Sequence, residues 1–171
     1  FPCIRHSGVL KTLRARGVRH VLFSNVDNLG AVLDPVVLGH HLRLGTAMSV
    51  EVTEKRKNAE GKWDKGGAPA VVDGERMIVE GFRFPADFRQ EQLPDFSTNT
   101  MYFSTEALDQ DFLLPRHVVT KTVDGRTAIQ LEAIACEASA AKRADGSKRF
   151  SLGLLRVERD GPRGRFFPVK E

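Results

Sequence analysis

A strand, a polar loop and a helix follow one another between residues 18 and 45, and this unit constrains the fold most. Residues 18–24 form an apolar, β-branched run, and its continuous rather than alternating character predicts a strand buried on both faces and paired in parallel. Asp34 and Pro35 then supply an N-cap and a first-turn proline for a helix that runs toward Gly45. Because ligands of open α/β sheets bind outside the carboxyl ends of the strands, we expect chemistry in the loop at residues 25–30.

A second apolar segment, residues 47–53, predicts the next strand and completes a βαβ unit. A crossover of this length favours parallel pairing with a right-handed connection. Upstream, Val9, Leu10 and Leu13 stand at helical spacing between Ser7, a good N-cap, and Gly17, a helix stop. With 171 residues, the chain is long enough for one hydrophobic core, so the prediction is an α/β fold in a single domain.

The remaining segments predict shorter elements separated by glycine-containing turns. Asp73 and Gly74 lie between two apolar runs in residues 70–80, which predicts a hairpin with a type I′ turn. The other predicted elements are a strand at residues 100–103, a short helix near 106–108, an alanine-rich helix at 127–141 after the Asp124-Gly125 turn, and late strands around 152–155 and 166–167. The charged loops at residues 54–67 and 142–149 are expected to be solvated.

Composition excludes several classes of protein. The chain has no run of about 18 apolar residues and no basic segment followed by an apolar one at its start, so we expect no membrane span, no signal peptide and a cytoplasmic location. Cys3 and Cys136 stand far apart in the sequence, which predicts reduced thiols. The net charge of +4 suits nucleic acid or phosphorylated small molecules. Because the basic loops lack interleaved aromatic residues, we expect no nucleic-acid partner.

Polar residues after the first predicted strand are the first candidates for a site. Asn25, Asp27 and Asn28 combine one carboxylate with two amides, a set that suits Mg²⁺ coordination and hydrogen bonds to sugar hydroxyls. The alternative is structural, because Asx side chains often cap turns and helices. Lys65 and the two glycines that follow it offer a cation and backbone that a ligand can approach closely. Because they lack P-loop spacing, a solvated hairpin entry is the alternative there.

Two further groups favour structural roles. Asp109 and Asp111 resemble a two-carboxylate metal motif, but they follow a predicted helix rather than a long apolar strand. His40 and His41 are adjacent, so on a helix they point about 100° apart and cannot chelate one ion together. Helix surface or packing is the better interpretation of both histidines.

An ordered set of short motifs gives the chain a family resemblance. The motifs are SNVDNLGA at residues 24–31, VEVT at 50–53, DKGG at 64–67, TNT at 98–100, QLE at 130–132 and RFFPVK at 165–170. In order and spacing they resemble the UTP–glucose-1-phosphate uridylyltransferases, over residues 7–171. The resemblance implies a Rossmann-like, GT-A-like nucleotidyltransferase core: an α/β mixed sheet with flanking helices, incomplete here because the matched part is the central catalytic region of a longer enzyme. Phe1 and Glu171 are accordingly expected to be cut points.

The same resemblance implies a reaction and a set of site residues. A phosphate oxygen of glucose 1-phosphate attacks the α-phosphorus of UTP with the help of Mg²⁺, giving UDP-glucose and pyrophosphate by in-line displacement. The implied residues are Asp27 as the Mg²⁺ ligand, Asn25, Gly67, Glu80 and Asn99 as glucose contacts, Lys170 as the cation at the reacting phosphates, and Lys65 and Gly66 as further substrate contacts. The implied partners are therefore small molecules, without a membrane or nucleic acid, and no pattern bears on oligomeric state.

The chain departs from the family pattern in two ways. Ser97-Thr98-Asn99 stands where the family usually has Asn-Thr-Asn, so a hydroxyl of shorter reach replaces one amide. The glycine-rich UTP loop, the Gly-His-Gly segment and the C-terminal β-helical region of the family are not in this sequence, so we expect the 171 residues alone to have little or no activity. The alternatives are a UDP-N-acetylglucosamine pyrophosphorylase, or a noncatalytic module that binds a nucleotide-sugar or nucleic acid.

Overall fold

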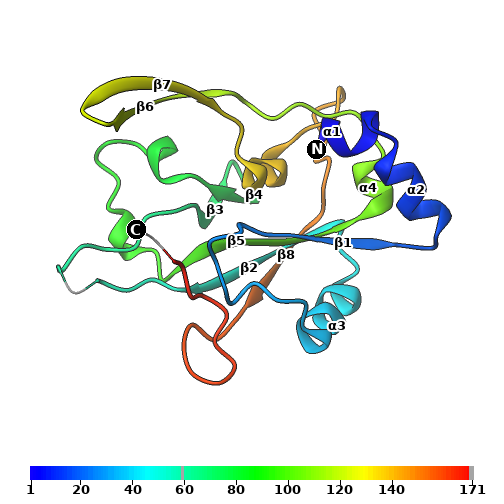
Figure 1. The fold of residues 1–171 in the computed structure, drawn as a ribbon, viewed down its shortest axis with the longest axis horizontal. Helices are drawn as coiled ribbons and strands as arrows, with labels where there is room; N and C mark the ends of the chain where they lie inside the picture. The colour runs from blue at the N-terminus through cyan, green and yellow to red at the C-terminus, as the bar shows by residue number, and fades with distance from the viewer. Residues whose placement is uncertain (59, 170–171) are drawn as a thin grey trace.

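A four-stranded mixed sheet forms the centre of the protein, seen in a computed structural model that describes residues 1–58 and 60–169 (Figure 1). The strands lie in the order β1 (His20–Phe23), β5 (Asp95–Ser104), β2 (Met48–Glu54) and β8 (Leu152–Arg156). β2 and β8 are parallel, whereas β5 is antiparallel to both of its neighbours. This mixed sheet with flanking helices confirms the predicted α/β class.

The two faces of the sheet differ in polarity because apolar and polar residues alternate along the central strand β2. Met48, Val50 and Val52 alternate with polar residues along the strand, yet all six residues from 48 to 53 are buried. The apolar side chains join a core with α2 (Val9–Ala15), α4 (Thr105–Leu108), β4 (Glu75–Val79) and the 3-10 helix η3 (Ala135–Ala140). The polar side chains Ser49 and Glu51 contact residues of α3 (Pro35–Leu44) and of the C-terminal segment. Both faces are therefore covered, one by apolar and one by polar neighbours.

The helix α3 forms where the sequence predicts it. One Asp34 carboxylate oxygen accepts hydrogen bonds from the Val36 and Val37 N–H groups at 2.7 and 3.1 Å, and Gly45 ends the helix in the left-handed conformation at φ 61°. The predicted first helix is α2, which begins after Gly8 rather than on a side-chain cap from Ser7. A further short helix, α1 (Pro2–His6), precedes it. None of the helices in residues 1–58 and 60–169 is long and apolar enough to cross a membrane.

Two hairpins extend from the sheet. The predicted hairpin is confirmed as β3 (Ala68–Val72) and β4, joined by Asp73 and Gly74 with φ of 51° and 77°, both positive as a type I′ turn requires. The second consists of β6 (His117–Val123) and β7 (Arg126–Glu132). The helix predicted for residues 127–141 is therefore wrong: the Asp124-Gly125 turn pairs the first half with β6, and the alanine-rich second half forms η3.

Other predictions fail because distant residues enter the sheet. β1 is not a buried parallel strand: it is an edge strand within the described residues, and it pairs with the antiparallel β5. β1 and β2 do run in the same direction, but β5 lies between them. Phe166 and Phe167 lie in an irregular segment rather than in a strand. Two short 3-10 helices, η1 (Gly81–Arg83) and η2 (Gln90–Gln92), complete the described elements.

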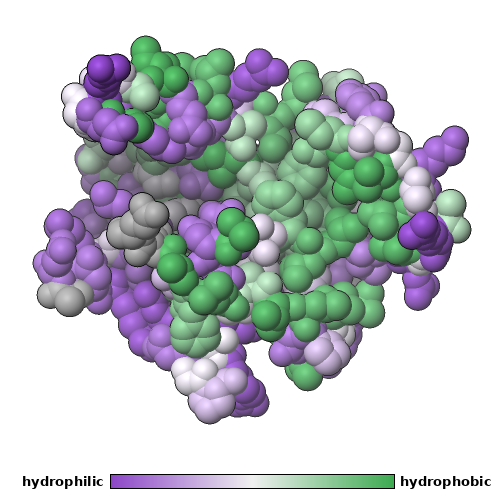
Figure 2. Space-filling view, in the orientation of Figure 1, coloured by the Kyte–Doolittle hydropathy of each residue, from purple (hydrophilic) through white to green (hydrophobic). Residues whose placement is uncertain are grey.

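Hydropathy divides the surface in the orientation of Figure 1. Figure 2 shows hydrophilic residues over the loop after β2, at the left, and apolar residues over α3 and the loop before it. The exposed apolar side chains of that second region are Val26, Leu29, Val32, Leu33, Val36, Leu42 and Leu44. The loop after β2 is thus the solvated, charged segment that the sequence predicts.

Candidate active site

Three loops follow the carboxyl ends of β1, β2 and β8, at one edge of the sheet. They comprise residues 24–34, 55–67 and 157–169, and the antiparallel β5 brings its first half to the same edge. β1 ends with Phe23 opposite Met101, so the loop that carries Asn25 leaves the sheet where β5 approaches Met101 from Asn99. The edge thereby gathers candidate residues from widely separated parts of the sequence.

Asn28 ties the first loop to the C-terminal segment. Its side chain is 5% exposed, its Nδ2 donates to the Arg165 carbonyl at 3.1 Å, and its Oδ1 accepts from the N–H groups of Gly30 and Phe167 at 3.2 and 2.9 Å. Gly30 is required there, because a Cβ would lie 2.5 Å from the Arg165 carbonyl carbon. The structural interpretation of Asx residues in this loop is thus correct for Asn28.

Asp27 and Asn25 are placed differently from Asn28. Asn25 is exposed and Asp27 is half-buried. The Asp27 carbonyl accepts from the Val169 N–H at 2.8 Å, whereas its carboxylate makes no hydrogen bond or ion pair within residues 1–58 and 60–169. Val169 is the residue before the predicted cation Lys170, which itself lies outside the described residues. The Asp27 backbone is therefore fixed while its side chain stays available.

The hairpin of β3 and β4 brings Gly67 and Glu80 together. Ala68 pairs with Val79, so the residues just outside them, Gly67 and Glu80, meet at the open end of the hairpin. A Cβ on Gly67 would lie 2.7 Å from Glu80 Oε1, so the carboxylate packs over a position that only glycine leaves open. Burial, with a contribution from the charge of Glu137, raises the pKa of Glu80.

Asn99 has an unusual backbone conformation within a strand. Its φ is 57°, and the β2–β5 register shifts between Val50 and Val52, opposite this part of β5. Its N–H donates to Ser97 Oγ at 3.1 Å, and its Oδ1 accepts from Cys136 Sγ at 3.2 Å. Non-glycine residues with positive φ cluster at functional sites, where the surroundings hold them.

The hairpin and the β5 site are joined through the main chain. The Gly67 carbonyl accepts from the Ser97 N–H at 2.7 Å. Ser97, the position at which the sequence departs from the family pattern, is 5% exposed, and its hydroxyl faces Cys136 and the Asn99 backbone. The structure thus brings Gly67, Glu80 and Asn99 into one cluster.

A hollow of about 740 Å³ lies beside this cluster. Its lining includes the predicted residues Lys65, Gly66 and Glu80. Two more lysines and two aromatic residues contribute to the wall: Lys55, Lys62, Trp63 and Phe82. Lysines beside the half-buried carboxylate of Glu80 suit a ligand that carries both phosphate and hydroxyl groups.

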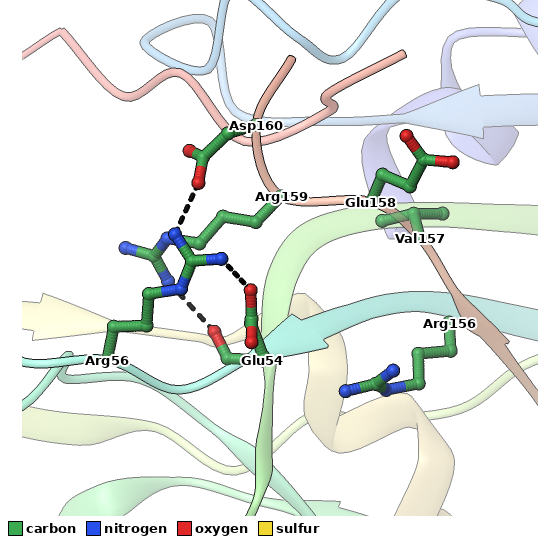
Figure 3. Close-up of a pocket in the computed structure, with 7 residues that line it drawn as sticks. All are labelled: Glu54, Arg56, Arg156, Val157, Glu158, Arg159 and Asp160. Atoms are coloured by element: carbon green, nitrogen blue, oxygen red, sulfur yellow. Dashed lines mark hydrogen bonds and ion pairs between the residues drawn. The ribbon is translucent and has the colours of Figure 1, made fainter.

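Arginines fix the loops after β2 and β8 around a second hollow of about 410 Å³ (Figure 3). Arg56 bridges Glu54 and Asp160, while Arg159 donates to the Glu54 carbonyl at 2.9 Å. Arg159 also donates to the Asp64 carboxylate at 2.7 Å. Each of these arginines has an acidic partner, so the group holds the loop that carries Lys65 rather than offering an open anion site.

A buried ion pair supports the first loop. Arg165 Nε and Nη2 donate to the two carboxylate oxygens of Glu51 at 2.8 and 2.7 Å, and Nη2 also donates to the Val32 carbonyl at 2.8 Å. The Tyr102 hydroxyl donates to Glu51 at 3.3 Å, and burial raises the pKa of Tyr102. A charge between two valines of a buried strand is a sequence signal for such a pair, but the sequence does not indicate its partner.

The acidic side chains of the site decide how Mg²⁺ could be bound there. No group of three or more His, Cys, Asp or Glu side chains that could hold a metal ion occurs in the described part of the chain. Mg²⁺, however, is commonly bound by one or two carboxylates together with substrate phosphates and water. The half-buried Asp27 carboxylate fits that mode, provided that the phosphates supply the other ligands.

The fold is of the α/β class, with loops from three strands gathered at one edge of a mixed sheet. The family model described as UTP–glucose-1-phosphate uridylyltransferase matches residues 1–171, and the chain belongs to this family. This confirms the resemblance that the short motifs indicate.

Individual relatives agree with the family model. The UTP–glucose-1-phosphate uridylyltransferase of Hordeum vulgare is 30% identical over 180 residues, which cover 99% of this chain and 35% of the relative. A UDP-glucose phosphorylase structure from Trypanosoma brucei matches with a TM-score of 0.72 and 25% identity, over 97% of this chain and 36% of that one. A variant UDP-glucose pyrophosphorylase from Leishmania major in complex with UDP-glucose matches with a TM-score of 0.70 and 25% identity, over 97% and 38%. The chain therefore spans about a third of the length of its relatives.

Proposed function

We propose that the protein containing this chain transfers a uridylyl group from UTP to glucose 1-phosphate, forming UDP-glucose and pyrophosphate. The observation that carries the proposal is the cluster of Gly67, Glu80 and Asn99 beside the Asp27 loop, in a chain that belongs to the uridylyltransferase family. The names of the relatives given above state this activity or a complex with UDP-glucose.

The proposed reaction forms one P–O bond and breaks another. A phosphate oxygen of glucose 1-phosphate attacks the α-phosphorus of UTP, and the bond from that phosphorus to the bridging oxygen breaks as pyrophosphate leaves. Mg²⁺, when bound, supplies positive charge that offsets the charge on the phosphates. Such a displacement requires positioning and charge stabilisation rather than a covalent nucleophile.

The residues of this chain have distinct proposed tasks. The Asp27 carboxylate holds Mg²⁺ from a loop that Asn28 and Val169 fix at the backbone. Asn25, Glu80 and Asn99 bind sugar hydroxyls, and Gly67 leaves the space in which the Glu80 carboxylate packs, so that its backbone can contact the sugar beside Glu80. Lys65 and Gly66 line the hollow as substrate contacts. Lys170 is proposed as the cation at the reacting phosphates because it follows Val169, which binds the Asp27 carbonyl.

Pyrophosphate release by the complete gene product, with UTP, Mg²⁺ and glucose 1-phosphate, tests the proposal. Asp27→Asn and Lys170→Ala should each lower kcat by orders of magnitude, because each removes a charge that stabilises the transition state. Asp73→Asn is the matched control, since Asn suits the exposed turn that joins β3 and β4 and should leave kcat unchanged. Normal turnover in both site variants would refute these roles.

The same assay separates the alternatives. Faster turnover of N-acetylglucosamine 1-phosphate than of glucose 1-phosphate would identify the other sugar specificity, and no turnover of either with tight UDP-glucose binding would identify a noncatalytic module. A polypeptide of residues 1–171 alone should form little UDP-glucose, because the family's glycine-rich UTP loop is not in this sequence.

A further inference from the structure

Asn99 takes part in a closed ring of three hydrogen bonds with Ser97 and Cys136, through its backbone N–H at one point and its side chain at another. The Asn99 N–H donates to Ser97 Oγ at 3.1 Å, Ser97 Oγ lies 3.3 Å from Cys136 Sγ, and Cys136 Sγ donates to Asn99 Oδ1 at 3.2 Å. The thiol has one hydrogen, and Asn99 Oδ1 at 3.2 Å is a nearer and stronger acceptor than Met101 Sδ at 3.9 Å, so we assign the hydrogen to Asn99 and the Ser97 hydroxyl then donates to the sulfur. Every donor in the ring then has one acceptor, and the direction of each bond is fixed.

The ring determines which end of the Asn99 amide faces outward. Its Oδ1 is turned toward the buried thiol, and its Nδ2 makes no hydrogen bond to any described residue. Burial raises the pKa of Cys136 to about 12, so the thiol stays protonated and able to donate at neutral pH. The NH₂ group of Asn99 is therefore presented as a pair of free donors.

We propose that Ser97 and Cys136 are positioning residues for sugar recognition: they hold Asn99 in its left-handed conformation and orient its NH₂ group to donate to a sugar hydroxyl oxygen. This inference rests on the proposed function and deepens it. It assigns a task to Ser97. The hydroxyl of Ser97 is buried and accepts a hydrogen bond from the Asn99 backbone N–H, so it fixes the conformation of Asn99 rather than contacting the sugar itself. The inference also assigns a task to Cys136, which carries no chemistry of its own.

A packing role is the competing explanation for Cys136. Its sulfur also lies 3.9 Å from Met101 Sδ within the apolar core. A packing role would change stability and affect both substrates, whereas a positioning role should change sugar binding alone. The test must therefore separate KM for glucose 1-phosphate from KM for UTP and from kcat.

The experiment compares Cys136→Ala, Cys136→Ser and Ser97→Ala in the complete gene product. Cys136→Ala and Ser97→Ala each remove two of the three bonds of the ring, so we expect KM for glucose 1-phosphate to rise about tenfold with KM for UTP unchanged. Cys136→Ser keeps a donor at the same place and should restore most of the affinity. Cys3→Ala, at the exposed cysteine, is the control that should change neither constant.

A double-mutant cycle gives the decisive comparison. Once Asn99→Ala has removed the amide, Cys136→Ala should raise KM for the sugar phosphate no further. An unchanged KM in an active Cys136→Ala protein, or additive effects in the cycle, would overturn the positioning role. If Cys136→Ala does not fold, Ser97→Ala in the same cycle decides. A complete protein that forms no UDP-glucose overturns the proposed function and this inference with it.

Discussion

His41 shows how much the individual buried polar residues of this protein depend on one protonation state. It lies on α3 with 1% exposure, its Nδ1 is 2.8 Å from Ser49 Oγ, and its Nε2 is 2.9 Å from His20 Nδ1. Burial lowers the pKa of His41 to about 4, and the neighbouring His20 adds to the effect. Protonation would place a positive charge in this buried site next to a second imidazole, and burial opposes the charged form.

The stability of the protein should consequently fall on the acid side of neutrality. The folded pKa of His41 is lower than its unfolded value of 6.5, so the unfolded chain takes up the proton first. The free energy of unfolding therefore has its full value above pH 6.5, where His41 is neutral in both states, and it decreases as the pH falls toward about 4. His41→Gln should reduce the drop in Tm between pH 7.5 and 5, whereas His40→Gln, at the exposed neighbouring position, should not. Equal drops in all three proteins would contradict this assignment.

Single residues at strand ends were predictable, but their supporting partners were not. Asp27 follows a predicted strand, so its placement is visible in the sequence, whereas Glu80 was indicated only by the family resemblance. Cys136 is 39 positions from Ser97 and 37 from Asn99 in the sequence, yet it contacts both. Glu51 and Arg165 form their ion pair across 114 positions. Side chains of this kind look unremarkable until the fold places them together, because their role depends on a partner that local patterns do not specify.

At the scale of elements, α3 carries a cap whose contribution can be measured. The Asp34 carboxylate accepts hydrogen bonds from two N–H groups of the first turn. These bonds lower the pKa of Asp34, and the bond from Val37 has the largest effect. Asp34→Ala should destabilise the protein by about 1 kcal/mol in urea denaturation at pH 7.

The acid dependence of the same cap has a defined sign. Because the folded pKa of Asp34 is lower than its ordinary value of 3.8, the stabilisation is present above that pH and is lost as the pH falls through the folded value. Asp34→Asn should keep the cap and lose this dependence. If Asp34→Ala unfolded at the same urea concentration as the unsubstituted protein, the cap would contribute nothing.

Elements with strong local signals formed as predicted, and those decided by distant pairing did not. The Asp34 cap and the Asp73-Gly74 turn act within a few residues, so α3 and the hairpin of β3 and β4 follow from the sequence alone. Residues 127–132 instead took the conformation that the Asp124-Gly125 turn and β6 impose, over the helical preference of the alanines that follow. β1 lost its expected parallel neighbour because β5, some eighty residues later, occupies that place.

For the whole molecule, one buried ion pair joins the parts that form the site. Arg165 contacts Glu51 of β2 and the Val32 carbonyl before α3, and its own carbonyl accepts from Asn28 in the Asp27 loop. Arg165 is 5% exposed and Glu51 fully buried. The segment of residues 165–169 is thereby held against the sheet and alongside Asp27, in a position that local sequence does not encode.

Breaking this pair should affect stability and catalysis together. Arg165→Met leaves the Glu51 charge buried without its partner, which should cost about 3–5 kcal/mol and lower kcat by loosening the Asp27 loop. Glu51→Gln in the same chain removes the orphaned charge, so the double variant should recover much of the stability but not kcat, because the bonds that hold the segment are still missing. Arg163→Met is the control, since its pair with Glu158 is exposed and should contribute less than about 1 kcal/mol. Urea denaturation and pyrophosphate release, measured on the complete gene product, check both effects. If Arg165→Met cost no more than Arg163→Met, the segment would have to be held by the Asn28 side chain and by the backbone bonds of Leu29 and Asp27 instead.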